Sequence, residues 1–207
     1  MMKTRKDVNG SVSERSAVVL VLIDVINRLD FEGGEKLVQF ALPMARRIVA
    51  LKKRAKARGI PTIYVNDNFG RWKSDFKAVV DRCLSADSPG RRLVELLRPE
   101  ADDYFVLKPK QSGFFGTPLS ILLEYLQART LILTGVAGNN CVLFTAHDAY
   151  LRNLQIIVPP DCIASETKRH NSEAIKQMRS VLKADTQVST KLRFSRLLKA
   201  SKQSGSK

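Results

Sequence analysis

TLILTGVAGNNCVLFTAHDAY, Thr130–Tyr150, joins an apolar run to a segment with helical spacing. The run Thr130–Val136 is apolar on both faces, which is typical of a buried strand in a parallel sheet. Cys141 follows at the point where the predicted strand gives way to the predicted helix. A helix N-terminus is positively polarised and favours thiolate, so this position makes Cys141 a candidate nucleophile. A free cysteine also commonly packs in a core, and this stretch alone leaves both roles open.

Length and composition predict a single soluble domain. The chain has 207 residues, of which 44% are hydrophobic and 27% charged, as is ordinary for a globular protein with a sizeable core. No apolar run approaches the ~20 residues of a membrane span, and residues 1–16 are polar, unlike a secretory signal. The three cysteines, Cys83, Cys141 and Cys162, have wide spacings that indicate neither a disulfide framework nor a zinc site. We expect a cytoplasmic protein that does not bind a membrane.

The net charge of +15 is concentrated in three segments of the chain. Residues 1–16 contribute +2, residues 46–58 contribute +7 and residues 190–207 contribute +6, so the remainder is neutral. Such segments can attract nucleic acid without sequence preference. Because no groove-reading motif accompanies them, we interpret the charge as a solvated helix face and chain ends. Nucleic acid is therefore not the expected partner, although binding of an anionic partner stays an open alternative.

Apolar runs and segments of helical spacing alternate along the chain. The predicted strands are Ala17–Ile23, Ile60–Val65, Tyr104–Leu107, Thr130–Val136, Leu154–Val158 and, at one edge, Thr186–Ser189. The predicted helices are Glu35–Arg58, Phe76–Leu84, Arg91–Leu97, Pro118–Gln127, Asn139–Leu151 and Glu166–Leu182. Pro43 lies inside the first helix and predicts a kink or a fresh start there. The alternation predicts a three-layer αβα fold with a six-stranded, mostly parallel sheet. Order 3-2-1-4-5-6 is among the strand orders that right-handed crossovers allow.

Three chemically different side chains follow strands of this predicted sheet. Asp24 follows the first strand, Lys108 the third and Cys141 the fourth. In a doubly wound sheet, ligands bind beyond the carboxyl ends of the strands, where the strand order reverses. If the strand order is 3-2-1-4-5-6, the first and fourth strands are neighbours at that point. We therefore expect the three side chains to face one crevice. Considered alone, Lys108 would be interpreted as a surface lysine at a strand end.

A cysteine nucleophile needs a proton acceptor within reach and donors for the negative charge that develops on the substrate. His147 lies six residues after Cys141, about 600° around a helix, and so faces away from it. Asp24 is therefore the better candidate for the base. The backbone N–H groups of residues 137–141 lie at a helix N-terminus and are candidate oxyanion donors.

Four segments resemble motifs of one family. LVLIDVIN (residues 20–27), KPKQSGFFGTPL (residues 108–119), TGVAGNNCVLFTAHDA (residues 134–149) and VPPDCIAS (residues 158–165) are similar to segments of the isochorismatase-like cysteine hydrolases. That family includes nicotinamidases and N-carbamoyl amidohydrolases. The resemblance covers roughly residues 17–190, between a polar tail of residues 1–16 and a basic C-terminal helix and tail of residues 191–207.

The resemblance implies roles for residues of this chain. Asp24, Lys108 and Cys141 would be the catalytic triad, and Val136–Ala137 would be joined by a cis peptide bond. The backbone N–H groups of Ala137 and Cys141 would form the oxyanion hole. The side chains expected to line the substrate pocket are Asn68, Trp72 and Phe114. For the two aromatic residues, packing in the core or at a subunit interface is the alternative, since the family commonly forms homo-oligomers, either dimers or tetramers.

Departures from the family pattern narrow the range of substrates that we expect. Many members read D-x-Q-N-D-F after the first strand, whereas here Asp24 is followed by VINRL. Nicotinamidases carry a D-x-H…H metal set after the second strand, where this chain reads VNDNFGRW, so neither a metal nor a cofactor is expected. Cys141 favours C–N hydrolysis over the vinyl-ether hydrolysis of isochorismatases, which often lack the cysteine. We expect hydrolysis of a small amide or carbamoyl substrate, with vinyl-ether hydrolysis and a non-catalytic binding protein as alternatives.

Overall fold

The computed structural model describes residues 15–72 and 75–203, and a parallel sheet forms their centre. Its strands are β1 (Val18–Ile23), β2 (Thr62–Asp67), β3 (Tyr104–Lys108), β4 (Thr130–Val136), β5 (Gln155–Ile157) and β6 (Ile163–Ala164). They are ordered β3-β2-β1-β4-β5, and β6 pairs with β4. The predicted α/β fold and the order of the first five strands are confirmed.

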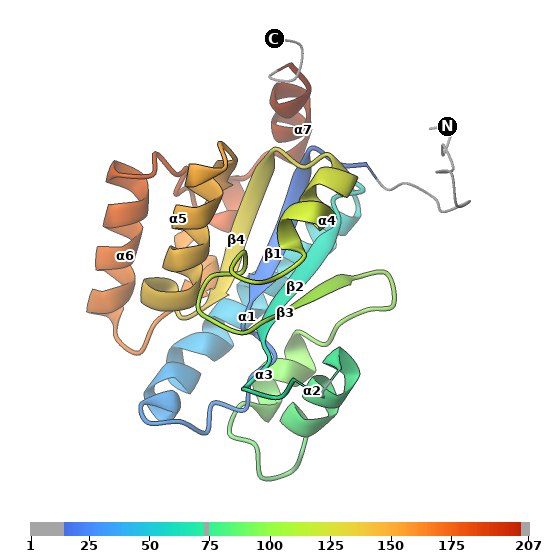
Figure 1. Ribbon diagram of the computed structural model, residues 1–207. Coiled ribbons are helices and arrows are strands. Elements are labelled where there is room, and N and C mark those ends of the chain that lie inside the picture. The colour runs from blue at the N-terminus through green and yellow to red at the C-terminus, as the bar shows by residue number, and fades with distance from the viewer. Residues whose placement is uncertain (1–14, 73–74, 204–207) are drawn as a thin grey trace.

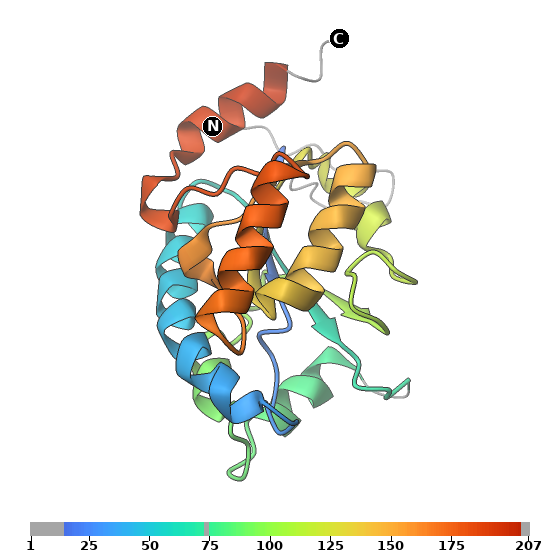
Figure 2. The ribbon, with the colours of Figure 1, turned by 90° about the vertical axis from the view of Figure 1, so that its left-hand side faces the viewer.

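Helices cover both faces of the sheet (Figures 1 and 2). They are α1 (Gly34–Lys56), α2 (Phe76–Cys83), α3 (Arg91–Leu96), α4 (Leu119–Leu126), α5 (Leu143–Leu151), α6 (Lys168–Ser180) and α7 (Phe194–Gln203). Short helical turns are η1 (Gly138–Val142), η2 (Pro160–Cys162) and η3 (Ser189–Lys191). Helices α1 and α3 pack on one face and α4, α5 and α6 on the other, which makes the three predicted layers.

Strand β1 is the middle of this core because all six of its residues are apolar and fully buried. Successive side chains of a strand point to opposite faces, so β1 contributes to both layers. The residues packed against the α1 layer are Val18, Leu20 and Leu22, and those packed against the α4–α6 layer are Val19, Val21 and Ile23. Burying each such side chain stabilises the fold by roughly 1.5–3 kcal/mol. A continuous apolar run, rather than an alternating one, therefore forms the central strand.

The last strand differs from the prediction. Thr186–Ser189 was expected at the sheet edge, but residues 186–188 form no strand and η3 begins at Ser189. Instead, Ile163–Ala164 pairs with the carboxyl end of β4, beyond the point where β5 stops. Pro159 and Pro160 explain the change, because proline has no N–H to donate to a ladder, and the chain leaves the sheet before returning.

Helix α1 continues through Pro43 without the predicted fresh start. Proline in a helix interior costs about 3 kcal/mol, since one hydrogen bond is lost and its ring crowds the preceding turn. The buried stripe of α1 continues on both sides of the proline, with Leu37 and Ala41 before it and Met44 and Ile48 after it. Packing of this stripe against the sheet outweighs the local cost.

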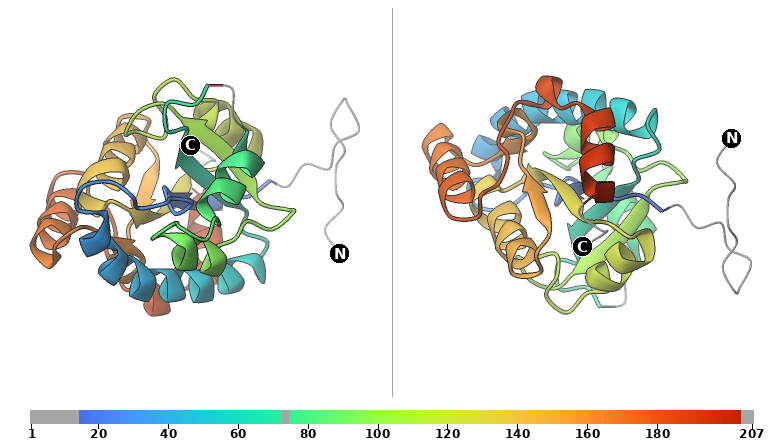
Figure 3. Two further views of the ribbon diagram at one scale, coloured as in Figure 1. Left: turned by 90° about the horizontal axis from the view of Figure 1, so that it is seen from below. Right: turned by 90° about the horizontal axis from the view of Figure 1, so that it is seen from above.

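The basic C-terminal segment forms α7, beyond the amino ends of the strands (Figure 3, right). Phe194 anchors the helix in the core, with the Arg54 guanidinium 5.2 Å from its ring centroid. Arg54 also donates to the carbonyl oxygens of Ser189 and Leu192, at 2.9 and 2.7 Å. The predicted tail of residues 1–16 lies almost wholly outside the described residues. Within the described ranges, no helix is long and apolar enough to cross a membrane.

Gly135 lets β1 and β4 approach closely at their carboxyl ends. It pairs with Ile23, has φ +111° and would place a Cβ atom 2.0 Å from the Ile23 carbonyl oxygen. Only glycine fits such a position, because both the backbone angle and the space exclude a side chain. The two strands that flank the candidate site therefore depend on this residue.

Gly135→Ala should lower the free energy of unfolding by about 3 kcal/mol or more, because the new methyl group meets rigid backbone. Gly59→Ala is the matched control: Gly59 also has positive φ, but nothing lies within 4 Å of its added Cβ. The control should lose only about 1–2 kcal/mol. Urea denaturation measures both values, and equal losses would contradict the steric explanation.

Candidate active site

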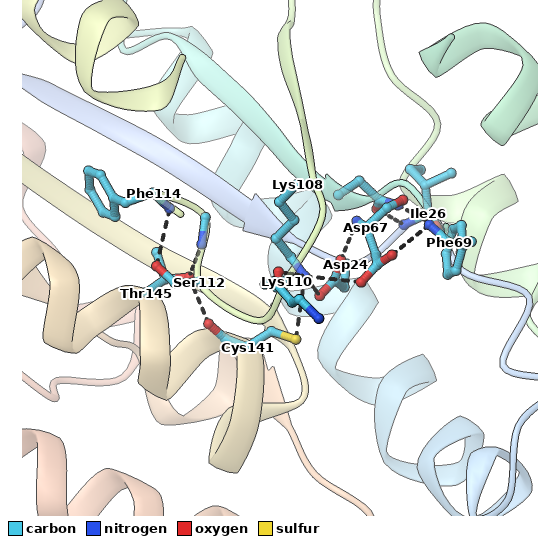
Figure 4. Close-up of polar contacts among 12 residues, drawn as sticks. Asp24, Ile26, Asp67, Phe69, Lys108, Lys110, Ser112, Phe114, Cys141 and Thr145 are labelled. Atoms are coloured by element: carbon cyan, nitrogen blue, oxygen red, sulfur yellow. Dashed lines mark hydrogen bonds and ion pairs between the residues drawn. The ribbon is translucent and has the colours of Figure 1, made fainter. Parts of the chain in front are cut away.

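Asp24, Lys108 and Cys141 meet at the carboxyl edge of the sheet, as predicted (Figure 4). The Lys108 ammonium nitrogen, Nζ, lies 2.8 Å from Asp24 Oδ2 and 3.5 Å from Cys141 Sγ. It also donates to the carbonyl oxygen of Lys110 at 3.1 Å. Lys108 therefore stands between the acid and the thiol, with a partner for each of its three donors.

The backbone after β1 fixes the Asp24 carboxylate. Asp24 has φ +50°, which is uncommon for a non-glycine residue and concentrates at functional sites. Its N–H donates to the Val65 carbonyl oxygen at 3.0 Å, and its Oδ1 accepts the Asp67 N–H at 2.7 Å. With Oδ1 held by β2, the other oxygen is directed at Lys108.

The nucleophile turn is locked to the loop that follows the lysine. Cys141 lies in η1, a five-residue turn of π-helix that leads into α5. Its carbonyl oxygen accepts the Thr145 hydroxyl at 2.7 Å, and the same hydroxyl oxygen accepts the Gly113 N–H at 3.0 Å. One turn further along α5, Asp148 accepts the Ser112 hydroxyl. The T-A-x-D part of the nucleophile segment thus joins the two loops that carry Cys141 and Lys108.

Burial sets the resting protonation of the trio. Burial, with the charge of Asp24, raises the pKa of Cys141 to about 12 despite the opposing effect of Lys108. The resting thiol is therefore protonated, whereas the helix N-terminus taken alone favours thiolate. Burial also raises the pKa of Asp24 against the pull of Lys108, so this carboxylate is a stronger base than an ordinary aspartate. For Lys108, burial lowers the pKa, but Asp24 and Cys141 reverse this and raise it, so the ammonium form persists.

The Val136–Ala137 peptide bond is cis, the geometry that the family resemblance implies for it. Two N–H groups of the following turn have partners within the protein. Asn139 donates to the Ser165 hydroxyl oxygen at 3.3 Å, and Asn140 donates to the Ala137 carbonyl oxygen at 3.0 Å. These two donors therefore do not face a substrate, and Ala137 and Cys141 stay the predicted oxyanion pair.

Sequence reasoning missed two polar residues at the end of β2. Asn66 is fully buried and exchanges two hydrogen bonds with the backbone of Ile26, at 3.0 and 2.9 Å. Asp67 places Oδ2 3.6 Å from Lys108 Nζ while its Oδ1 accepts the Phe69 N–H at 2.5 Å. The signal for both residues is VND, Val65–Asp67, where polar side chains follow an apolar run at a strand end.

The three predicted pocket residues lie in different surroundings. Asn68 is buried beside the site, where its N–H donates to the Lys108 carbonyl oxygen at 3.0 Å. Phe114 packs in the core instead of the pocket, with the Arg152 guanidinium 4.5 Å from its ring centroid, and Figure 4 shows it directed away from Cys141. Trp72 is 78% exposed, and its role in a pocket stays a prediction.

Comparison with known families matches residues 18–190 to the isochorismatase domain. The chain belongs to the isochorismatase family. It is 41% identical over 166 residues to the uncharacterized isochorismatase family protein YaaI of Bacillus subtilis, covering 80% of this chain and 91% of that protein. It is 29% identical over 176 residues to ureidoacrylate amidohydrolase RutB of Methylorubrum extorquens, covering 72% of this chain and 70% of that protein.

Solved structures share the fold of this isochorismatase family member. N-carbamoylsarcosine amidase from Thermoplasma acidophilum superposes with a TM-score of 0.65 at 25% identity, covering 85% of this chain and 98% of that one. An isochorismatase family protein from Desulfovibrio vulgaris superposes with a TM-score of 0.70 at 22% identity, covering 89% and 100%. The αβα architecture is therefore that of the family.

A protonated resting thiol makes a direct prediction about alkylation. Because the pKa of Cys141 is raised to about 12, its alkylation by iodoacetamide should be slow at pH 7. The rate should rise about tenfold per pH unit and reach no plateau below pH 10. Mass spectrometry of the Cys141 peptide measures this rate, with Cys141→Ala as the blank. A plateau near pH 8 would contradict the assigned protonation state.

Proposed function

We propose that this protein hydrolyses a C–N bond of a small amide or carbamoyl substrate through an acyl-enzyme on Cys141. The observation that carries the proposal is the contact of one buried ammonium with both a carboxylate and a thiol, at 2.8 and 3.5 Å. The names of two relatives, an amidohydrolase and an amidase, support the same bond type. The described residues contain no group of three His, Cys, Asp or Glu that could hold a metal ion, and the proposed steps use none.

In the first step, Asp24 takes the proton of the Cys141 thiol, and the Lys108 ammonium contacts both groups. The sulfur attacks the carbonyl carbon, so that a C–S bond forms and the negative charge moves to the carbonyl oxygen. Backbone N–H groups of Ala137 and Cys141 would stabilise this oxyanion. Asp24 then gives its proton to the leaving nitrogen, the C–N bond breaks, and the amine or ammonia departs from a thioester.

The second half returns the enzyme to its resting state. Asp24 accepts a proton from water, which attacks the thioester carbon and displaces the Cys141 sulfur. The acid product leaves, and the sulfur regains its proton from Asp24. Throughout, the Lys108 ammonium touches both groups, so the proton can move between oxygen and sulfur without leaving an isolated negative charge in the buried site.

Cys141→Ala should lower turnover by about a thousandfold or more while the protein stays folded, since it removes the group that forms the covalent bond. A screen of small amides, ureides and isochorismate, with ammonia release as the readout, identifies the substrate. Cys162→Ala is the control, because Cys162 is a buried thiol outside the trio. Unchanged turnover in Cys141→Ala would end the proposal. Hydrolysis of isochorismate with no acyl adduct on Cys141 would favour vinyl-ether hydrolysis instead.

Asp24→Asn should separate the two roles of the carboxylate. Loss of the base should lower turnover by at least about a hundredfold. Loss of its negative charge should lower the pKa of Cys141 and speed iodoacetamide alkylation at a given pH, because Asp24 is among the causes that raise that pKa. Slower alkylation together with slower turnover would indicate a collapsed site rather than a missing base.

A further inference from the structure

A cleft of about 440 Å³ lies between the loops after β1 and β2 and helix α2, and its volume is within the size range of small-molecule sites. The loops that follow β1 and β2 form two of its walls, and α2 forms the third. Its lining includes Arg28, Asp30, Phe69, Arg71, Val79 and Arg82. Figure 3 (left) shows α2 lying across the carboxyl edge of the sheet, where ligands bind in folds of this class.

Asp67 contacts both the catalytic trio and a residue that lines this cleft. One of its carboxylate oxygens lies 3.6 Å from Lys108 Nζ, and the other accepts the Phe69 N–H at 2.5 Å. Phe69 has φ +52° and presents a ring that is 40% exposed. In Figure 4 it lies on the side of Asp24 away from Cys141. The cleft is therefore placed to receive the part of a substrate that is distant from the reacting carbonyl.

The positive charges that line the cleft are not equivalent. Arg28 is neutralised by ion pairs to Asp30 at 2.6 Å and Asp87 at 2.8 Å, and its other donors reach Ser85. Arg71 and Arg82 are exposed, and the described ranges show no ion pair for either, although the charge of Arg82 joins Arg28 in lowering the pKa of Asp30. Two guanidinium groups on one cleft repel each other, and an anion between them removes that repulsion.

We propose that Arg71 and Arg82 bind a carboxylate of the substrate while the Phe69 ring packs against its planar apolar part. A guanidinium matches a carboxylate with two parallel hydrogen bonds, and an exposed aromatic ring offers a flat contact for an unsaturated or aromatic segment. The substrate class is then an amide or carbamoyl derivative that carries a carboxylate remote from the scissile bond. That this ligand is a substrate rests on the proposed hydrolase activity. That the cleft binds a carboxylate does not rest on that activity.

Benzoate and its neutral isostere benzamide test the site directly on the full-length protein. Isothermal titration should show benzoate bound at least tenfold more tightly than benzamide. Arg71→Gln and Arg82→Gln should each weaken benzoate binding about tenfold, the loss expected for a charge-assisted hydrogen bond. Arg46→Gln removes the same charge from an exposed position on α1 and should leave binding unchanged. Equal binding of benzoate and benzamide, no binding of benzoate, or unaltered binding in both arginine variants would overturn the site.

Kinetics then separate the subsite from the reaction. For amides hydrolysed by the wild-type protein, Arg71→Gln and Arg82→Gln should raise KM about tenfold when the substrate carries a carboxylate. The same variants should leave kcat unchanged, and KM for neutral amides should not move. Charge-selective benzoate binding without any amide hydrolysis would reject the reaction and keep the anion site. Amide hydrolysis with no effect of substrate charge would reject the subsite and keep the reaction.

Discussion

The buried ammonium of Lys108 is the interaction on which the site depends. Its side chain has no solvent-exposed surface, and an unpaired ammonium in such surroundings would cost several kcal/mol. Asp24 supplies the opposite charge, and the Cys141 sulfur and the Lys110 carbonyl oxygen accept its other protons. Each member of the trio is thus required by the others. A lysine placed there without the carboxylate would lose its proton or disrupt the fold.

The strand order explains why this residue is a lysine. Neighbouring strands lie about 4.8 Å apart, and β2 separates β3 from β1, so a side chain from the end of β3 must span roughly 10 Å. A four-carbon stem with a compact charge fits that task. Strand β2 also helps to align the target, because its Asp67 N–H holds one oxygen of Asp24 and leaves the other for Lys108. Three parallel strands in this order therefore produce one ion pair.

Much of this arrangement could be predicted from the sequence, because the central strands and the residues that follow them have recognisable local patterns. Largely apolar runs identified β1 and β4, and the polar residues that follow the predicted strands identified Asp24, Lys108 and Cys141. Strand β6 has only two residues, too few to show any period, and its pairing is set by where two prolines release the chain. Protonation of Cys141 could not be predicted either. It depends on the partial burial of the sulfur and on the nearby charge of Asp24, which a helix-terminus argument does not include.

Charge balance also explains why recognition and reaction would use separate positive groups. The trio combines one ammonium with one carboxylate, and the ammonium already contacts Asp24 and the sulfur. An anionic group of a substrate placed there would face Asp24 and compete for Lys108, which would slow the proton transfer that the thiol requires. A carboxylate is better held where a positive charge makes no ion pair, and within the described ranges Arg71 and Arg82 of the cleft make none. Asp67 contacts both Lys108 of the trio and Phe69 of the cleft, so the loop after β2 fixes the position of the cleft relative to the trio. This loop would therefore set the distance between the bound carboxylate and the scissile carbonyl.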